Sequence, residues 1–494
     1  MGRSDGRGRD TTEGYEPWGA GELPGYDEYS VRPDERWGPD EEMTRARRRL
    51  LVRKESVYVR RRRAVFGGLG ALAALLVVAL VALALGQGSA GSALADITDV
   101  RDSVAVPPPG DAAPGASAED PAGQSAAAGD PATTTQPEEV AVWQQEPTPL
   151  EHASDLTALT QVDYITEGTP KSVVASGHGL IISNNMMYSH TSSIWDSRSR
   201  EVLTRLDDAV DLTEFGIEGH PGTSRGSPVE ATWTADGRYA YVSNYSMYGE
   251  NFGVEGFDDC FKDSGVGAST VYRFDAEEMD WDQVIEVGAV PKYLEITPDQ
   301  STLLVSNWCD YTVSVVDMAT GKETGTLDVG RNPRGIVVMP DNRTAIVTAM
   351  WNQQVWRLDL EEMTSEVVME TPPGPRHLNL TADGSTLYLV VARSDVIYKL
   401  DAETMEILDE VNPGLEPRSM AMSPDEKSLY VVNYDEATVS KIRTSDMEVI
   451  DKVDVDAVPI GIDYDPVTNT VWVACYNGGV YVFDDQSTLL ADAG

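Results

Sequence analysis

Residues 291 to 330 read PKYLEITPDQSTLLVSNWCDYTVSVVDMATGKETGTLDVG, and this stretch decides the fold. It contains four short runs of strand-forming residues, which are KYLEIT, TLLVSN, TVSVVD and ETGTLDV. Turn signals separate the runs, at Pro298-Asp299 and at Thr320-Gly321. The stretch therefore predicts one module of four antiparallel strands.

The module recurs at a fixed spacing. Five prolines stand 42 residues apart, and two more open related but longer modules; the seven are Pro170, Pro228, Pro291, Pro333, Pro375, Pro417 and Pro459. A period in this range is typical of repeat architectures, because one module cannot bury its own apolar faces. We expect an all-β fold, a seven-bladed β-propeller of four-stranded antiparallel blades.

The residues after each proline indicate how a blade is oriented. The third and fifth are apolar in nearly every module, whereas the second and fourth are mixed and often polar. We expect this first strand to lie innermost, with its polar side chains toward a central channel. The last module lacks one strand, so we expect residues of about 160–167 to supply the outer strand of blade seven and close the ring.

The repeats resemble the YVTN-type propeller family. The resemblance is carried by the segments Ser423-Pro424-Asp425, Leu429-Tyr430-Val431-Val432-Asn433 and Thr312-Val313-Ser314-Val315-Val316-Asp317. It implies the propeller fold. It also implies either a binding or surface protein or a lactonase, because the family includes both.

A candidate membrane span precedes the repeats. Residues 64 to 85 carry no charged or strongly polar side chain, and this segment is long enough to cross a bilayer. A basic stretch stands before it. We expect residues 1–63 to be a disordered cytoplasmic tail, 64–86 a transmembrane helix, 87–150 a disordered Ala/Pro/Gly-rich linker and 151–494 the propeller, outside the cytoplasm. The alternative is a signal peptide cleaved after Ala93-Leu94-Ala95, which also exports the propeller.

The charge balance limits the partners. The chain has 38 Lys and Arg against 81 Asp and Glu, and a net charge of -43 disfavours a nucleic-acid partner. We find no Walker loop, dinucleotide fingerprint or zinc-type cysteine pairing, and we expect no cofactor. The expected partner of a monomeric propeller is a cell-envelope ligand or another protein.

Two modules are longer than the others. The interval after Pro170 exceeds 42 residues by 16 and the interval after Pro228 by 21, and both additions fall on loops of the same face. They predict a lid or a recognition wall, with decorative surface loops as the alternative. Cys260 lies in the second addition and Cys309 in the matching loop of the next blade, so an exported protein should join them by a disulfide.

A candidate ligand site follows from the residue after each proline. Five of these residues are cations on the rim of the predicted propeller, and aromatic residues stand near the ends of the second strands; the set is Lys171, Lys292, Arg334, Arg376 and Arg418 with Tyr245, Trp308, Trp351, Tyr434 and Tyr476. Cations with aromatic planes suit a carboxylate, a phosphate or a sugar-containing ligand. The alternative is that the cations pair with neighbouring carboxylates and fix the spacing of the blades.

Catalytic and metal-binding signals are weaker. Glu230, Glu295, His377 and Asp463 could meet in the channel as acid, base or cation ligands, but polar channels filled with water are ordinary. Met186, Met187 and His190 could bind copper, although such residues on a loop usually pack, so no metal is assigned. The leading hypothesis is a membrane-anchored binding or scaffold module for an anionic or glycan-like envelope ligand. The second is a lactonase-like hydrolase that uses the channel carboxylates and His377.

Overall fold

Seven four-stranded antiparallel sheets and one two-stranded sheet make up the computed structural model, which describes residues 141–187 and 189–490. The predicted cytoplasmic tail, the transmembrane helix and residues 87–140 of the predicted linker lie outside these residues. In the part of the chain that is described, no helix has the length and apolar character needed to cross a membrane.

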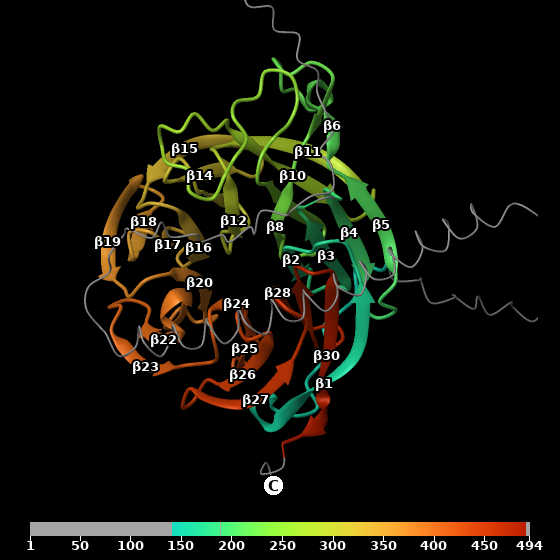
Figure 1. Ribbon diagram of the computed structural model, residues 1–494, viewed down its shortest axis with the longest axis vertical. Helices are drawn as coiled ribbons and strands as arrows, with labels where there is room; N and C mark the ends of the chain where they lie inside the picture. The colour runs from blue at the N-terminus through green and yellow to red at the C-terminus, as the bar shows by residue number, and fades with distance from the viewer. Residues whose placement is uncertain (1–140, 188, 491–494) are drawn as a thin grey trace, which may run out of the picture. The chain divides into compact units, whose positions relative to one another are not determined.

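The seven large sheets surround the centre of the domain as the blades of a propeller (Figure 1). We number the blades from the N-terminal end of the repeats. Their innermost strands are β2 (Ser172–Ala175), β8 (Pro228–Trp233), β12 (Pro291–Ile296), β16 (Pro333–Val338), β20 (Pro375–Leu380), β24 (Pro417–Met422) and β28 (Pro459–Asp465). Six of the seven begin at the proline that defines the repeat, so the expected all-β, seven-bladed architecture is confirmed.

The other strands follow from the inside outward in chain order. The second strands are β3 (Leu180–Asn185), β9 (Tyr239–Asn244), β13 (Thr302–Asn307), β17 (Thr344–Ala349), β21 (Thr386–Val391), β25 (Ser428–Asn433) and β29 (Thr470–Cys475). The third strands are β4 (Thr191–Asp196), β10 (Ser269–Asp275), β14 (Thr312–Asp317), β18 (Gln354–Asp359), β22 (Val396–Asp401), β26 (Thr438–Arg443) and β30 (Gly479–Leu489). The outer strands are β5 (Val202–Asp207), β11 (Asp280–Val287), β15 (Lys322–Asp328), β19 (Thr364–Glu370), β23 (Ile407–Val411), β27 (Glu448–Asp454) and β1 (Thr157–Thr166).

Blade seven combines two distant parts of the chain. Its outer strand is β1, which pairs antiparallel with β30 from Thr157 opposite Leu489 to Thr166 opposite Gly479. The register shifts twice along this ladder. The outermost strand of this blade therefore comes from the start of the repeat region and its other three from the end.

Residues 141–156 lie against the propeller before β1 begins. The backbone N–H of Thr148 donates to the carbonyl of Pro466 at 2.8 Å, and the hydroxyl of Ser154 donates to Asp425 at 2.6 Å. Gln145 and Thr148, near the end of the predicted linker, therefore contact the blades.

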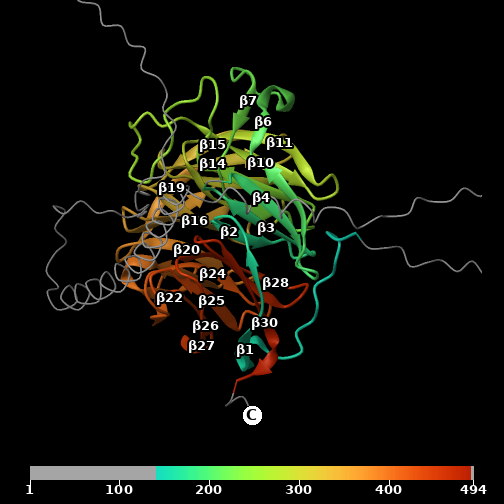
Figure 2. The ribbon, with the colours of Figure 1, turned by 45° about the vertical axis from the view of Figure 1, so that its right-hand side comes forward.

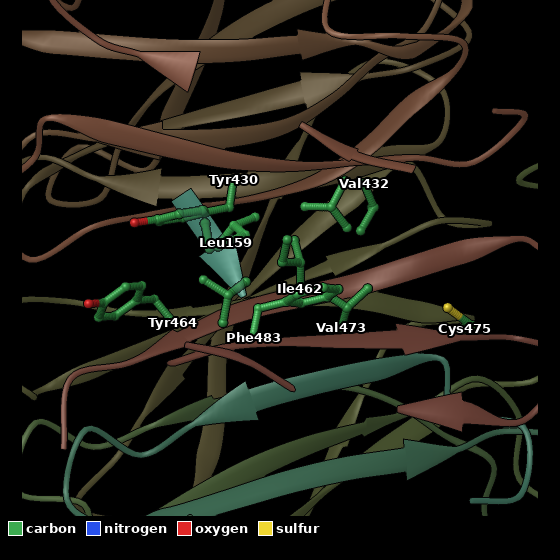
Figure 3. Packing of buried hydrophobic residues seen from close by; sticks show 11 residues of the cluster. Leu159, Tyr430, Val432, Ile462, Tyr464, Val473, Cys475 and Phe483 are labelled. Atoms are coloured by element: carbon green, nitrogen blue, oxygen red, sulfur yellow. The ribbon is translucent and has the colours of Figure 1, made fainter. Parts of the chain in front are cut away.

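The core lies between neighbouring blades. Figure 3 shows one such layer, in which Leu159 of β1 and Tyr430 of β25 meet Ile462 of β28 and Phe483 of β30. These four side chains are at most 7% exposed. Burial of each large apolar side chain stabilises the fold by about 1.5–3 kcal/mol, so the alternation of apolar residues along the inner strands is what joins the sheets.

Candidate functional site

The two additions to the repeat touch each other on one face. The first contains the hairpin β6 (Ala209–Asp211) and β7 (Thr223–Arg225), joined through the short helix η2 (Leu212–Phe215), and the second is residues 245–268. Arg225 and Tyr248 exchange backbone hydrogen bonds of 2.8 and 2.7 Å between the two additions. We call residues 208–226 and 245–268 together the lid; β6 and β7 stand above the blades in Figure 2.

The lid has its own apolar core. Val210 and Leu212 of the first addition pack with Met247 of the second and with Tyr272 of β10. The phenol of Tyr272 also donates to the carbonyl of Asp208 at 3.1 Å. The expectation that both additions rise together from one face is therefore confirmed.

A disulfide fixes the second addition to blade three. Cys260 and Cys309 are bonded, with their Cα atoms 5.4 Å apart, as the sequence predicted. Cys475 is a buried free cysteine. The disulfide holds the second addition of the lid against blade three.

The five cations that follow the prolines are buried. None of Lys171, Lys292, Arg334, Arg376 and Arg418 is more than 4% exposed, so their expected place on an open rim is wrong. In blades two to seven the ladder between the first and second strands shifts register directly after the proline. Such bulges redirect side chains, which explains why an alternating pattern misplaced these residues.

Carboxylates lie close to Arg334, Lys292 and Arg418. Arg334 lies 3.6 Å from Glu230, Lys292 lies 3.3 Å from Asp258 of the lid, and Arg418 lies 2.9 Å from Glu416; these distances join the closest nitrogen and oxygen. The alternative that the cations pair with neighbouring carboxylates thus describes part of the arrangement. Sequence reasoning missed Asp258, because nothing in the repeat locates a residue within an insertion.

Most of the predicted aromatic residues cover these cations. The ammonium of Lys292 lies 4.4 Å from the ring centre of Tyr245 and 5.0 Å from that of Trp308. The other contacts are Arg418 with Tyr434 at 3.3 Å, Lys171 with Tyr476 at 5.5 Å, and Trp351 with Arg393 at 4.6 Å. Ring faces attract cations, so these aromatic residues help to hold the positive charges in place.

Four of the cations act on one carboxyl group. Burial raises the pKa of Glu230, which lies on β8, and four cations from blades one, three, four and five oppose that rise: Lys171, Arg334, Arg376 and Lys292. Charges on separate blades affect a common group only when they lie close to it. We call these four residues and Glu230 the cation cluster.

The remaining channel residues surround Tyr293 of β12. Burial raises the pKa of its phenol, and Glu295, Glu230 and Asp463 raise it further by their negative charges. The ring of His377 stands edge-on to that of Tyr293, with 5.4 Å between ring centres. The four catalytic candidates therefore do gather around one side chain.

The protonation states of these catalytic candidates differ from what simple acid–base catalysis needs. Burial, assisted by the charges of Arg334 and Arg376, lowers the pKa of His377 to about 3, so its imidazole is neutral and weakly basic. Burial raises the pKa of Glu295 to about 8. It also raises that of Asp463 to about 7, although this carboxylate accepts hydrogen bonds from the N–H groups of Ala175 and Tyr464.

The structure offers no support for a metal centre. Among the described residues, no group of three or more His, Cys, Asp or Glu side chains is arranged to hold an ion. The Nδ1 atom of His190 lies 3.0 Å both from Asp208 and from the carbonyl of Gly226. His190 thus joins blade one to the lid. This contact does not support the copper hypothesis for Met186, Met187 and His190.

A cavity that the sequence did not predict lies at the other end of the inner strands. Its volume is about 300 Å³, and blades three, four and five form its walls. Glu295 is the carboxyl group among its lining residues. Pro298 and Pro340, seven residues after the repeat proline, line it, but Pro424 and Pro466 stand at the same offset in blades that do not, so the sequence gives no specific signal for the cavity.

Comparison with known proteins does not identify a relative that fixes the function. No family model and no curated protein matches the chain. Among solved structures, hydrazine synthase of Kuenenia stuttgartiensis is similar over 65% of this chain and 98% of that chain, with 16% sequence identity and a TM-score of 0.48. This likeness carries no functional statement. The propeller is shown by its strand order, and membership of the YVTN-type family stays a prediction.

Proposed function

We propose that the protein is an extracytoplasmic binding module that holds an anionic ligand at the cation cluster. The observation that carries this is the burial of four cations from different blades, Lys171, Lys292, Arg334 and Arg376, with Arg334 3.6 Å from the carboxyl of Glu230. A repeat fold needs no such convergence for its stability, since burying charge is costly.

The chemistry of the cluster favours carboxylate or phosphate groups. Two of its cations are arginines, Arg334 and Arg376, whose planar guanidinium groups match two oxygens of an anion at once. Glu230 lies 3.6 Å from Arg334, and a ligand anion would bind beside it or take its place. Because the cations are buried and the lid stands over this face, a small anionic group or the end of a chain fits better than a broad surface.

Two further observations support a place outside the cytoplasm. The Cys260–Cys309 disulfide is the kind of bond that persists in oxidising compartments. The apolar segment 64–86 with its basic flank would anchor the domain to the membrane with its N-terminus inside. The ligand in this proposal is a component of the cell envelope or an acidic group on a partner protein.

Binding of glucuronate and of inorganic phosphate to the purified full-length chain, measured by calorimetry, tests the proposal. The double variant Arg334→Gln and Arg376→Gln should weaken binding at least tenfold. The matched control is Arg343→Gln in blade four, because Arg343 is exposed and pairs with Asp359 at 2.6 Å on the outside of the blade. Equal binding by the double variant and the control would remove the cation cluster as the site.

A hydrolase remains the second candidate, on one observation. A carboxyl with a pKa of about 8, as at Glu295, is protonated at neutral pH and could act as a general acid. Hydrolysis of a panel of lactones by the wild type, lost in Glu295→Gln, would favour it. The neutral His377 argues against that residue as the base.

A further inference from the structure

The cavity beside Glu295 forms a second site, separate from the cation cluster. β12 runs from Pro291 at the cluster toward Ile296, and at about 3.3 Å per residue Glu295 lies about 10 Å along the strand from Lys292. The cavity of about 300 Å³ takes its walls from the ends of three inner strands and the turns after them: Glu295, Pro298, Val337, Pro340, Asn379 and Leu380.

Two acceptor groups lie in the lining of the cavity, among both apolar and polar side chains. One is the carboxyl of Glu295. The other is the Oδ1 atom of Asn379, which is buried and has no hydrogen-bond partner among the described residues. A buried acceptor without a donor is unfavourable, so a ligand that brings donors would gain affinity by satisfying it. The remaining walls combine apolar side chains of valine, leucine, proline and alanine with the phenol of Tyr293 and the hydroxyl of Thr381.

We propose that this cavity binds a small organic ammonium ion. The N–H groups of the ligand donate to Glu295 and to Oδ1 of Asn379, and its apolar body packs against Pro298, Val337 and Pro340. The volume is at the lower end of the range for small-molecule sites, which favours a ligand of a few carbon atoms over a peptide. The site is independent of the proposed anion binding.

Binding at this site is linked to proton release. Burial raises the pKa of Glu295 to about 8, so its carboxyl is protonated in the free protein at neutral pH. An ammonium ion in contact favours the ionised form, and the proton leaves to solvent as the ion pair forms. The titratable and charged groups that share the channel are Tyr293, Glu230, Asp463, Arg334 and His377. Affinity should therefore rise with pH up to about 8.

Calorimetry on the full-length chain with benzylammonium as the probe tests the proposal. Benzyl alcohol, which has a similar shape and no charge, should bind at least tenfold more weakly. Titration at pH 6.5 in two buffers of different ionisation enthalpy should show close to one proton released per ligand. Failure of benzylammonium to bind, or equal binding of the alcohol, would overturn the proposal.

Two variants and one control locate the binding. Glu295→Gln should reduce affinity for benzylammonium at least tenfold and abolish proton release, and Asn379→Leu should reduce affinity severalfold while leaving proton release. Glu323→Gln, an exposed carboxylate on β15 of the same blade, should change neither. If Glu295→Gln loses its fold by circular dichroism, Asn379→Leu decides alone. Wild-type affinity in the folded variants, or tighter binding of a lysine tripeptide than of benzylammonium, would contradict a small-molecule ammonium site.

Discussion

The two ends of the inner strands differ in charge although the same strands build both. At one end, the residue after the repeat proline is a cation in five blades, and four of these cations act on Glu230. At the other end, Glu295 and Asn379 stand at equivalent positions of blades three and five, and the matching residue of blade four is Val337. A residue type repeated around the ring concentrates one kind of charge at the axis, whereas residues that differ between blades make a pocket on one side.

The prediction with the largest expected effect compares the same substitution, glutamate to glutamine, at the two ends of the inner strands. Glu230→Gln removes the acidic partner that lies 3.6 Å from the buried Arg334, which should lower the free energy of unfolding by about 3–5 kcal/mol. Glu295→Gln should not lower it between pH 5 and 8, because that carboxyl is already protonated over most of this range. Urea unfolding followed by circular dichroism measures both.

Stability measured with added phosphate distinguishes an anion-binding site from a purely structural pair of Glu230 and a cation. A ligand that binds only the folded state stabilises it in proportion to the logarithm of its concentration, so phosphate should restore part of the stability lost in Glu230→Gln. The same phosphate should have no effect on Glu295→Gln beyond its effect on the wild type. Loss of equal size in the two variants would mean that the ends do not differ as described.

The disulfide provides the second largest test, because it acts at one end alone. Cys260→Ser removes a link that spans 49 residues, which should cost about 2–4 kcal/mol of stability. The freed lid should weaken binding of anions, since Asp258 of the lid contacts Lys292. Benzylammonium binding should stay within twofold of the wild type, and a parallel loss at both ends would show that the lid controls the whole channel.

The smallest expected effect is a change in how the free energy of unfolding depends on pH. Glu295 has a folded-state pKa of about 8, above its unfolded value, so the stability it contributes is present below about pH 4.5 and is lost as the pH rises to about 8. The slope is on the order of 1 kcal/mol per pH unit. Glu295→Gln should remove this decline, so the variant gains stability over the wild type as the pH rises from 5 to 8. Denaturant midpoints at several pH values would measure the difference, and parallel profiles would contradict the raised pKa.

The sequence predicted the parts of the fold that repeat. The period located the start of six of the seven inner strands, which begin at the proline itself, and the seventh begins two residues later, at Ser172. It also placed the lid on one face and paired Cys260 with Cys309. These features depend only on the end of the strand from which a loop leaves. The alternating direction of the strands in a blade determines that end.

The sequence predicted which residues belong to the candidate site, but not how they are arranged in space. Alternation of side chains cannot detect the register shift after the proline in blades two to seven, so it missed the burial of the cations in blades three to six. The partner Asp258 lies in an insertion that has no counterpart in other blades. The cavity depends on how large the side chains of three blades are where they meet, and one strand pattern does not contain that information.

The pairing of β1 with β30 has a consequence for synthesis of the chain. Thr160 of β1 contacts Thr488 of β30 across 328 residues of sequence. At about 5–20 residues per second a ribosome needs roughly 20–60 seconds to make that interval. During this time the strand β1 has no partner, and an unpaired strand edge invites pairing with other chains. Any chain that stops before residue 479 therefore carries this edge permanently, so premature termination should yield aggregates or early proteolysis rather than a smaller working propeller.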